Sequence, residues 1–174
     1  EYLKEGNQRF INNLKINRNL LQQVNQTSEG QFPFAVILSC IDSRTSAEII
    51  FDQGLGDIFS IRIAGNILNE DILGSMEYAC NVAGSKLIVV LGHNKCAAIT
   101  SACNNYRMGH FTGLLDKLKP AIDNEASVLS DRNGRNAEFI NKVSINNVLY
   151  TIKQIRDKSN ILYDLESIKK IRIT

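Results

Sequence analysis

Two short clusters in this sequence contain residue types that bind transition metals. Residues 40–44 are Cys-Ile-Asp-Ser-Arg, and residues 92–96 are Gly-His-Asn-Lys-Cys. Together they offer two thiols, one imidazole and one carboxylate, a mixed ligand set that suits tetrahedral zinc. Structural zinc sites usually fill all four positions with Cys and His. Here only three such residues are at hand, which leaves the fourth position for water or Asp42 and favours a catalytic site.

The segments in front of the two clusters predict how these residues meet. Residues 34–40 and 86–91 are short apolar runs, as expected of buried strands. Ligands of open α/β sheets bind at the carboxyl ends of the strands. Residues i and i+2 of an extended chain point the same way, so Cys40 and Asp42 can face one point. If the two strands are neighbours, His93 and Cys96 join them there.

Cys96 is also expected in the first turn of a helix that starts near residue 95. The positive end of a helix dipole stabilises anions and would favour the thiolate form of this cysteine. The neighbouring Asp42 and Arg44 have a simpler interpretation, a local ion pair that shapes the turn. Their position beside a ligand makes a role at the metal the better hypothesis.

Strand-like and helix-like segments alternate along the rest of the chain. Helices are expected over residues 1–15, over 45–54 after a capping box at Thr45–Glu48, over 70–83, from about 95, over 114–157 with a break near 131–134, and briefly at 161–165. Strands are expected over 34–40, 57–63, 86–91 and 170–173, and a polar connection over 22–31. This order predicts an α/β fold with a central, mostly parallel sheet flanked by helices. A single domain of residues 1–174 would comprise a helical arm (about 1–30) and an α/β core (about 31–174).

Composition narrows the function classes. The chain has 174 residues and a net charge of +2, which gives no indication of a nucleic-acid partner. No apolar run approaches the roughly 18–20 residues that cross a bilayer, so no membrane partner is expected. Four cysteines in a mid-sized domain favour metal or thiol chemistry in the cytoplasm over a disulfide framework.

Other residues of chemical interest have plainer explanations. Cys80 and Cys103 fall on helix faces with apolar neighbours and are expected in the core. His110 lies in a polar stretch and is expected at the surface. Gly54-Leu-Gly56 precedes a strand and lacks a phosphate-loop lysine, which argues against a nucleotide site.

The two clusters together resemble the signature of the β-class carbonic anhydrases. The similarity continues through Arg62-x-x-Gly65-Asn66, residues 77–79 (Glu-Tyr-Ala) and the helix near residue 113, in the family's order. It implies reversible hydration of carbon dioxide to bicarbonate and a proton by zinc-bound hydroxide, with one zinc ion per subunit. It assigns Cys40, His93 and Cys96 as ligands and Asp42 and Arg44 as the catalytic dyad. Loss of the Arg44 contact would let Asp42 become a fourth ligand in a closed state.

The same resemblance implies a homodimer or homotetramer with active sites at a subunit interface. The first helix would pack on a neighbouring subunit through an apolar face that includes Leu3, Phe10 and Leu14. The alternative is that this face packs on its own domain. The resemblance adds four substrate-pocket residues: Gln31, Phe59, Tyr78 and, through its backbone N–H, Ala97.

The sequence departs from the family pattern at two places. Ile63 stands where the family commonly has Asn, and Ala97 where it commonly has Gly. The absence of tryptophan predicts that the bicarbonate-inhibited control of one family subgroup is missing. Two alternatives remain. One is a carbon disulfide or carbonyl sulfide hydrolase, which would use the same zinc and nucleophile. The other, which Ile63 and Ala97 leave open, is an inactive, zinc-stabilised regulatory domain.

Overall fold

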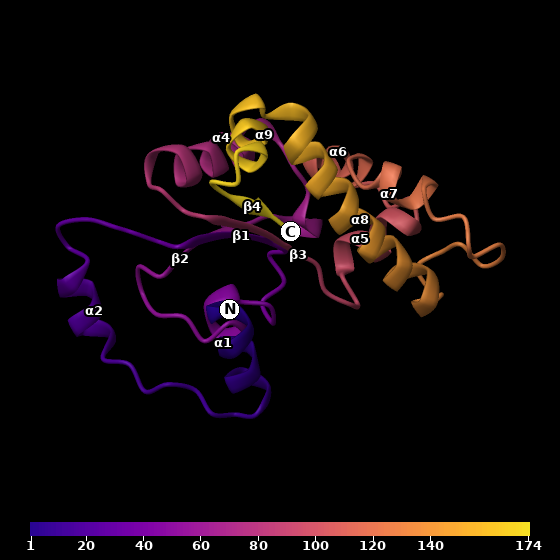
Figure 1. Cartoon of the computed structure of the whole chain (residues 1–174). Coiled ribbons are helices and arrows are strands. Elements are labelled where there is room, and N and C mark those ends of the chain that lie inside the picture. Colours follow the sequence, from indigo (N-terminus) through magenta and orange to yellow (C-terminus); the bar gives the residue numbers. More distant parts are fainter.

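Four parallel strands form the centre of the molecule (Figure 1). The computed structural model describes all residues from 1 to 174. The strands run in the order β2-β1-β3-β4, and their bounds are β1 Ala35–Ser39, β2 Ile58–Arg62, β3 Leu87–Leu91 and β4 Arg172–Ile173. Ser39 at the end of β1 pairs with Arg62 on one side and Leu91 on the other. The carboxyl ends of these three strands are therefore level, and the segments that follow them start side by side.

Helices surround the sheet and connect its strands. Their bounds are α1 Tyr2–Ile11, α2 Leu20–Gln26, α3 Ala47–Ile50, α4 Glu70–Glu77, α5 Ala97–Cys103, α6 Gly109–Asp116, α7 Lys119–Asp123, α8 Ala137–Lys158 and α9 Asn160–Ser167, with a 3₁₀ turn η1 Ala64–Asn66 and a π-helical turn η2 Tyr78–Val82. Side chains cap several of these helices. Asn69, Asn136 and Ser159 each accept a hydrogen bond from the backbone N–H three residues later, which satisfies an otherwise unpaired donor of the first turn. These caps explain why α4, α8 and α9 begin where they do.

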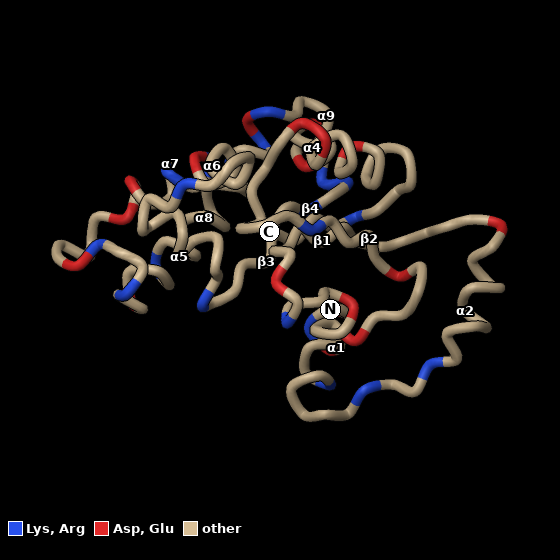
Figure 2. Tube along the Cα trace, turned by 180° about the vertical axis from the view of Figure 1, so that it is seen from behind, with Lys and Arg blue, Asp and Glu red and all other residues tan.

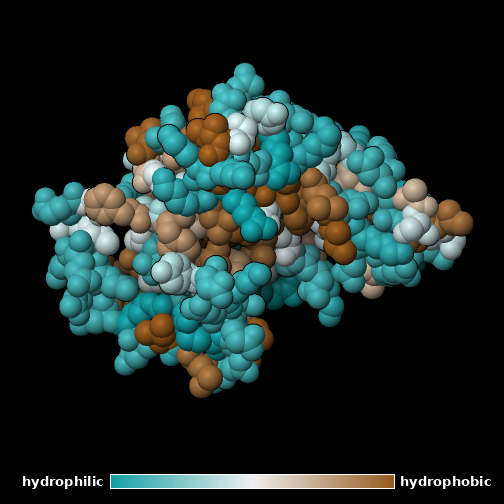
Figure 3. All heavy atoms as spheres, in the orientation of Figure 1, coloured by the Kyte–Doolittle hydropathy of each residue, from teal (hydrophilic) through white to brown (hydrophobic).

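The two faces of the sheet are covered unequally. On one face, α4, α8 and α9 lie over the strands (Figure 1), and side chains such as Val36, Leu38 and Ile88 enter a core cluster of 13 buried residues. On the other face lie α1 and α3, and the corresponding cluster has only five buried residues, among them Leu3 and Ile37. Hydrophobic atoms remain visible over the middle of the molecule, between the arm and the upper helices (Figure 3). The face that carries the arm is thus the less completely buried one.

The expected α/β class and parallel sheet are confirmed, but several helix boundaries were wrong. The helix expected over 1–15 ends at Ile11, and the expected connection over 22–31 contains α2. The helix over 70–83 is α-helical only to Glu77 and continues as the π turn η2. The break near 131–134 is wider, since the chain from 124 to 136 lies between α7 and α8. The sequence contains no proline at these ends, so tertiary packing had to decide them.

The capping box expected at Thr45–Glu48 was also wrong. α3 begins at Ala47, with Ser46 as its extended N-cap. The Thr45 hydroxyl donates instead to the Asp42 carbonyl, and the Glu48 carboxylate accepts hydrogen bonds from Ser46 and Ser60. The hydrogen bonds of these side chains go to the loop after β1 and to Ser60 of β2, and not to the free N–H groups at the start of α3. Separately, none of the helices is both long enough and apolar enough to span a membrane.

Candidate metal centre

The side chains of Cys40, His93 and Cys96 converge at the carboxyl ends of β1 and β3. One ligand atom from each lies within 4.8 Å of the others. Cys40 directly follows β1, and His93 comes two residues after β3. Lys95 adopts a left-handed φ of 52°, which turns the chain between His93 and Cys96. Cys96 is the N-cap of α5, not a first-turn residue as expected. Adjacent parallel strands thus bring together the three residues that the sequence predicted as ligands.

The geometry of these side chains fits zinc. The two Sγ atoms lie 3.9 Å apart. This agrees with the separation of about 3.8 Å expected for two sulfurs that each lie about 2.3 Å from a tetrahedral zinc. His93 Nδ1 lies 2.9 Å from the Asn94 carbonyl oxygen. A carbonyl only accepts, so Nδ1 must donate. The buried Nε2, which has no hydrogen-bond partner, is then left with a free lone pair, as in a metal-binding histidine.

The two thiols influence each other's protonation. The pKa of Cys40 is lowered to about 4 because Cys96 donates a hydrogen bond to its thiolate, an effect that outweighs burial and is aided by His93 and the Gly65 N–H. The pKa of Cys96 is raised, because its proton is engaged by Cys40 and because it is buried. The pair therefore accepts one negative charge readily and a second only beside a cation. A divalent ion would supply that compensation.

Asp42 and Arg44 form a two-pronged ion pair beside this cluster. Arg44 Nε donates to Asp42 Oδ1 at 2.9 Å, and Nη2 donates to Oδ2 at 2.7 Å. The Arg44 backbone N–H adds a third contact of 3.0 Å to Oδ1. The Arg44 guanidinium and then its N–H hold the pKa of Asp42 well below its usual range. Asp42 is therefore ionised and turned toward Arg44, and it is not among the residues that converge on the metal position.

Arg62 supports the loop that carries Cys40 and Asp42, a role that sequence reasoning missed. Its Nε donates to the Cys40 carbonyl at 3.1 Å, and its Nη2 donates to the Asp42 carbonyl at 2.6 Å. Both contacts arise because Arg62 ends β2, directly beside the end of β1. The resemblance singled out Arg62 as part of a motif, but only the register shows what it holds.

Gly65 approaches the candidate metal ligand Cys40 with its backbone. Its N–H lies 3.3 Å from Cys40 Sγ, and its φ of 70° is in the left-handed region that favours glycine. A Cβ at this position would lie 3.2 Å from Leu118 and 3.4 Å from Ala98. The carbonyl of Gly65 accepts a 2.7 Å hydrogen bond from Asn147 on α8. Sequence reasoning missed Asn147, although a polar residue on the apolar face of a helix was a usable signal.

The four predicted substrate-pocket residues are not gathered around the chain's own metal cluster. Ala97 is exposed beside Cys96. Gln31 is exposed before the amino end of β1, whereas Cys40 follows the other end. Phe59 pairs with Val36 in the sheet, four residues and roughly 13 Å of extended chain from Cys40. Only Ala97 is thus adjacent to a ligand.

Phe59 and Tyr78 do meet each other. Their rings pack edge to face with centroids 6.3 Å apart. They border a hollow of about 730 Å³ between β2 and α4, whose other lining residues are Ser60, Ile61, Glu70, Asp71, Gly74 and Ser75. This hollow lies along the free edge of the sheet, away from the three ligands.

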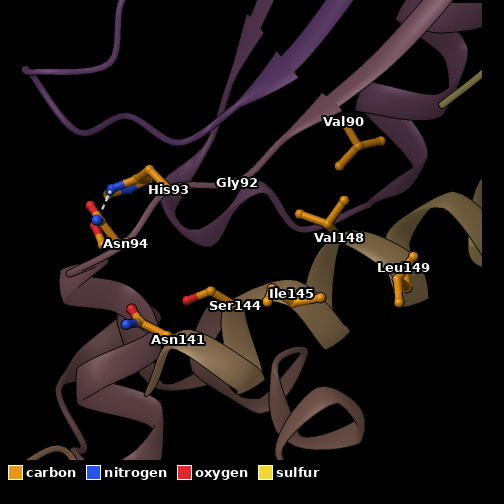
Figure 4. Close-up of a pocket in the computed structure, with 9 residues that line it drawn as sticks. All are labelled: Val90, Gly92, His93, Asn94, Asn141, Ser144, Ile145, Val148 and Leu149. Carbon is orange, nitrogen blue, oxygen red and sulfur yellow. Dashed lines mark hydrogen bonds between the residues drawn. The ribbon is translucent and has the colours of Figure 1, made fainter. Parts of the chain in front are cut away.

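A second hollow, of about 410 Å³, lies between the end of β3 and α8 (Figure 4). Asn94 and His93, joined by their hydrogen bond, mark one end, and Val90, Val148 and Leu149 lie toward the other. Neither ligand sulfur lines it. The hollow therefore borders the metal cluster only through His93.

The remaining cysteines and histidine lie where the sequence predicted. Cys80 and Cys103 are buried in apolar surroundings, and burial raises the pKa of each thiol to about 11. His110 is exposed. None of the three belongs to the metal cluster.

Comparison with known proteins places this arrangement in a family. A family model described as carbonic anhydrase matches residues 35–174. Carbonic anhydrase 2 of Mycobacterium tuberculosis is 42% identical over 128 residues, which make up 69% of this chain and 61% of that protein. The chain thus spans about three-fifths of the length of this relative (61%).

Solved structures show the same fold. A Coccomyxa beta-carbonic anhydrase in complex with acetazolamide superposes with a TM-score of 0.78 at 20% identity, covering 98% of this chain and 78% of that one. A tetrameric beta-carbonic anhydrase of the ascomycete Sordaria macrospora gives 0.76 at 23% identity, covering 86% and 77%. Because the family model spans the whole sheet and both ligand-bearing clusters, this chain belongs to the β-class carbonic anhydrase family.

Proposed function

We propose that this chain reversibly hydrates carbon dioxide to bicarbonate and a proton, using one zinc ion per subunit held by Cys40, His93 and Cys96. The observation that carries the proposal is the convergence of these three ligand atoms within 4.8 Å, next to an ionised Asp42. Family membership supports the same activity. When bound, zinc acidifies a coordinated water, so that a strong nucleophile exists near neutral pH.

Asp42 orients the attacking water in this proposal. Its carboxylate accepts a hydrogen bond from that water and directs an oxygen lone pair toward carbon dioxide. Arg44 holds the carboxylate through the two-pronged contact and keeps it ionised. Because the pKa of Asp42 is so low, Asp42 cannot store the proton that hydration releases. That proton leaves to solvent or buffer.

Asp42 also has a second proposed state. It lies two residues after the ligand Cys40 and is held off the metal position only by its contacts with Arg44. If the side-chain contacts break, Asp42 can rotate to become a fourth ligand and close the site. An Arg44 variant in which zinc keeps an exchangeable water would argue against this state.

We further propose a homodimer or homotetramer in which a second subunit completes the substrate pocket. Gln31, Phe59 and Tyr78 lie too far from their own metal cluster to touch its substrate, whereas a partner's cluster could face them. The backbone N–H of Ala97 would contribute from the subunit that holds the metal. The tetrameric Sordaria relative supports such assembly.

The N-terminal helix contributes only part of its surface to such an interface. Leu3 is buried against its own sheet, and α1 lies so close to α3 that a Cβ on Gly6 would be 1.7 Å from the Phe51 carbonyl oxygen. Tyr2, Ile11 and Leu14 remain exposed. The arm therefore packs on its own domain with one side and offers the other side to a neighbour.

Charge and thiol chemistry support the remaining assignments. Basic and acidic residues are interspersed over the molecule (Figure 2), and the net charge is +2, so no nucleic-acid partner is proposed. Cys40 and Cys96 must stay reduced to hold a metal, which favours the cytoplasm. Ile63 packs against both large core clusters and has a structural role there. No observation specifically favours the sulfur substrates or an inactive domain.

A stopped-flow assay of carbon dioxide hydration with a pH indicator, at mildly alkaline pH and known zinc content, tests the proposal. We expect turnover well above the buffer rate, and its loss together with zinc in Cys96→Ser. Cys103→Ala is the matched control, because Cys103 is buried at the other end of α5 and lies outside the metal cluster. A zinc-loaded wild-type chain without turnover would contradict the proposed activity.

A further inference from the structure

A chain of contacts connects the long helix α8 with the metal ligand Cys40. Asn147 Nδ2 donates to the Gly65 carbonyl at 2.7 Å, and the Gly65 N–H donates to Cys40 Sγ at 3.3 Å. Asn147 is 1% exposed and Cys40 is 4% exposed, so water does not compete for either contact. The three residues belong to α8, η1 and the end of β1, which are far apart in the sequence.

Gly65 needs an outside contact to hold its orientation. A residue without a Cβ is not confined by its own side chain, and it populates several backbone conformations at similar energy. Leu118 and Ala98 flank the space where a Cβ would lie, but neither makes a directional contact. The hydrogen bond from Asn147 to the Gly65 carbonyl is the directional contact that a distant helix makes here, and it restrains the peptide group between Gly65 and Asn66 in addition to the bond from the Asn66 N–H to the Ile63 carbonyl.

The placement of Asn147 carries an energetic cost that calls for an explanation. The buried residues of α8 include Phe139, Ile140, Val143 and Ile155, and a polar side chain among them must be hydrogen-bonded to be tolerated. Asn147 meets that need by reaching the segment whose N–H points at the ligand sulfur. A structural tie between α8 and η1 alone would not require the bonded residue to be the one that contacts Cys40.

We propose that Asn147 is a positioning residue for the metal centre: it orients Gly65 so that the Gly65 N–H donates to Cys40 Sγ. Such a hydrogen bond withdraws electron density from the thiolate and fixes the direction of its lone pairs. Partners of this kind typically change metal affinity by about 10–100-fold when removed. The inference rests on the proposed zinc site and extends it to a residue that touches neither metal nor substrate.

Zinc competition with a chromophoric chelator tests the inference in the wild type, Asn147→Ala and Asn147→Asp. Thr151→Val is the matched control, because Thr151 lies one turn further along α8, is equally buried at 1% exposed, and contacts the neighbouring Asn66 carbonyl at a longer 3.4 Å. We expect the zinc dissociation constant to rise about tenfold or more in both Asn147 variants and to stay near the wild-type value in Thr151→Val. Wild-type affinity in a folded Asn147 variant, or an equal loss in Thr151→Val, would overturn the inference.

A second measurement does not depend on how well the variants fold. In the wild-type protein loaded with ¹¹³Cd, a scalar coupling between the metal and the Gly65 amide proton is expected through the N–H···S contact. Its absence would overturn the inference. A wild-type chain that binds neither zinc nor cadmium would instead contradict the proposed metal site itself, so the two failures are distinguishable.

Discussion

At the carboxyl ends of β1 and β3, side chains from several distant segments converge, whereas many apolar side chains of the segment that precedes β1 are exposed to solvent. Cys40 and Cys96 are 4% and 1% exposed, but Leu21 and Phe32 are 79% and 88% exposed. Three separate contacts, from Arg62, Gly65 and Arg44, hold the loop after β1. α2 has no buried residue at all, and it lies at the edge of the molecule (Figure 1).

This contrast separates the parts of the proposed enzyme that one chain forms alone from those that need a second subunit. The proposed metal ligands converge within one subunit. The proposed substrate pocket does not, since Gln31, Phe59 and Tyr78 lie away from these three residues. The arm is attached where Leu3 packs on the sheet and at Asp52, which is clamped by Arg9 and Arg18 at 2.5 and 2.6 Å. Beyond that clamp, apolar side chains of the arm such as Ile11 and Leu21 are exposed. Changes at the two regions should therefore have different consequences.

The largest effect is expected from Arg44→Ala. Without the guanidinium, Asp42 loses its two-pronged contact and is free to rotate onto the metal, so the hydration rate should fall about 100-fold while zinc stays bound. Arg44→Lys should recover part of the rate, because lysine restores the charge but not the paired geometry. Rates and zinc content measured on the same samples test this. Full activity in Arg44→Lys would mean that the pair merely shapes the turn.

A smaller loss is expected from Arg62→Gln, which removes the charged contacts to the Cys40 and Asp42 carbonyls. We expect a fall in hydration rate of about tenfold and weaker zinc binding, because the loop after β1 becomes less well positioned. Arg135→Gln serves as the control, because Arg135 is exposed and lies in the connection between α7 and α8. Unchanged kinetics in Arg62→Gln would show that the register of β1 and β2 alone holds the loop.

The clamp on the arm should respond to pH. Burial opposes ionisation of Asp52, but hydrogen bonds from Arg9 and Arg18 outweigh it and lower its pKa to about 2. An aspartate with a lowered folded-state pKa stabilises the fold above its unfolded pKa of about 3.9, and this contribution is lost as pH falls toward 2.

Asp52→Asn tests that dependence, because asparagine tolerates the positive φ of 45° at this position. It should lower the free energy of unfolding by on the order of 1–2 kcal/mol at neutral pH. This is less than the pKa shift alone would give, because the two arginines are partly exposed and water screens their charge. The difference should shrink below about pH 4. Denaturant unfolding at several pH values measures it, and a difference independent of pH would contradict the assignment.

The smallest effect on the fold is expected from Leu21→Ser on α2. Because this side chain is 79% exposed, the free energy of unfolding of the subunit should change by no more than about 0.5 kcal/mol. On the proposal that the exposed side of the arm contacts a neighbouring subunit, association should weaken, because an exposed apolar side chain of the arm is lost. Analytical ultracentrifugation over a concentration series measures this, with exposed Lys4→Ser as the control. Unchanged association would place the interface elsewhere.

The convergence of the candidate ligands and the fold class could be predicted from the sequence because their signals are local. Cys40 and His93 each follow an apolar run of strand length, and parallel strands bring their carboxyl ends to one edge. The dyad of Asp42 and Arg44 was predictable for the same reason: its two residues are neighbours in one turn. Helix ends were less predictable. The ends near Cys96, Thr45 and Glu77 are set by side-chain and packing contacts with residues outside their own segments.

The residues that support those candidate ligands are identified by contacts between elements that are distant in the sequence. Arg62 reaches Cys40 because β2 and β1 pair in one particular register. Asn147 reaches Gly65 across 82 residues of sequence, because α8 packs over that end of the sheet. Contacts of this kind depend on strand order and helix placement, which no local pattern encodes. Local sequence patterns therefore specify which chemical groups the site contains, and the packing of distant elements specifies how those groups are arranged.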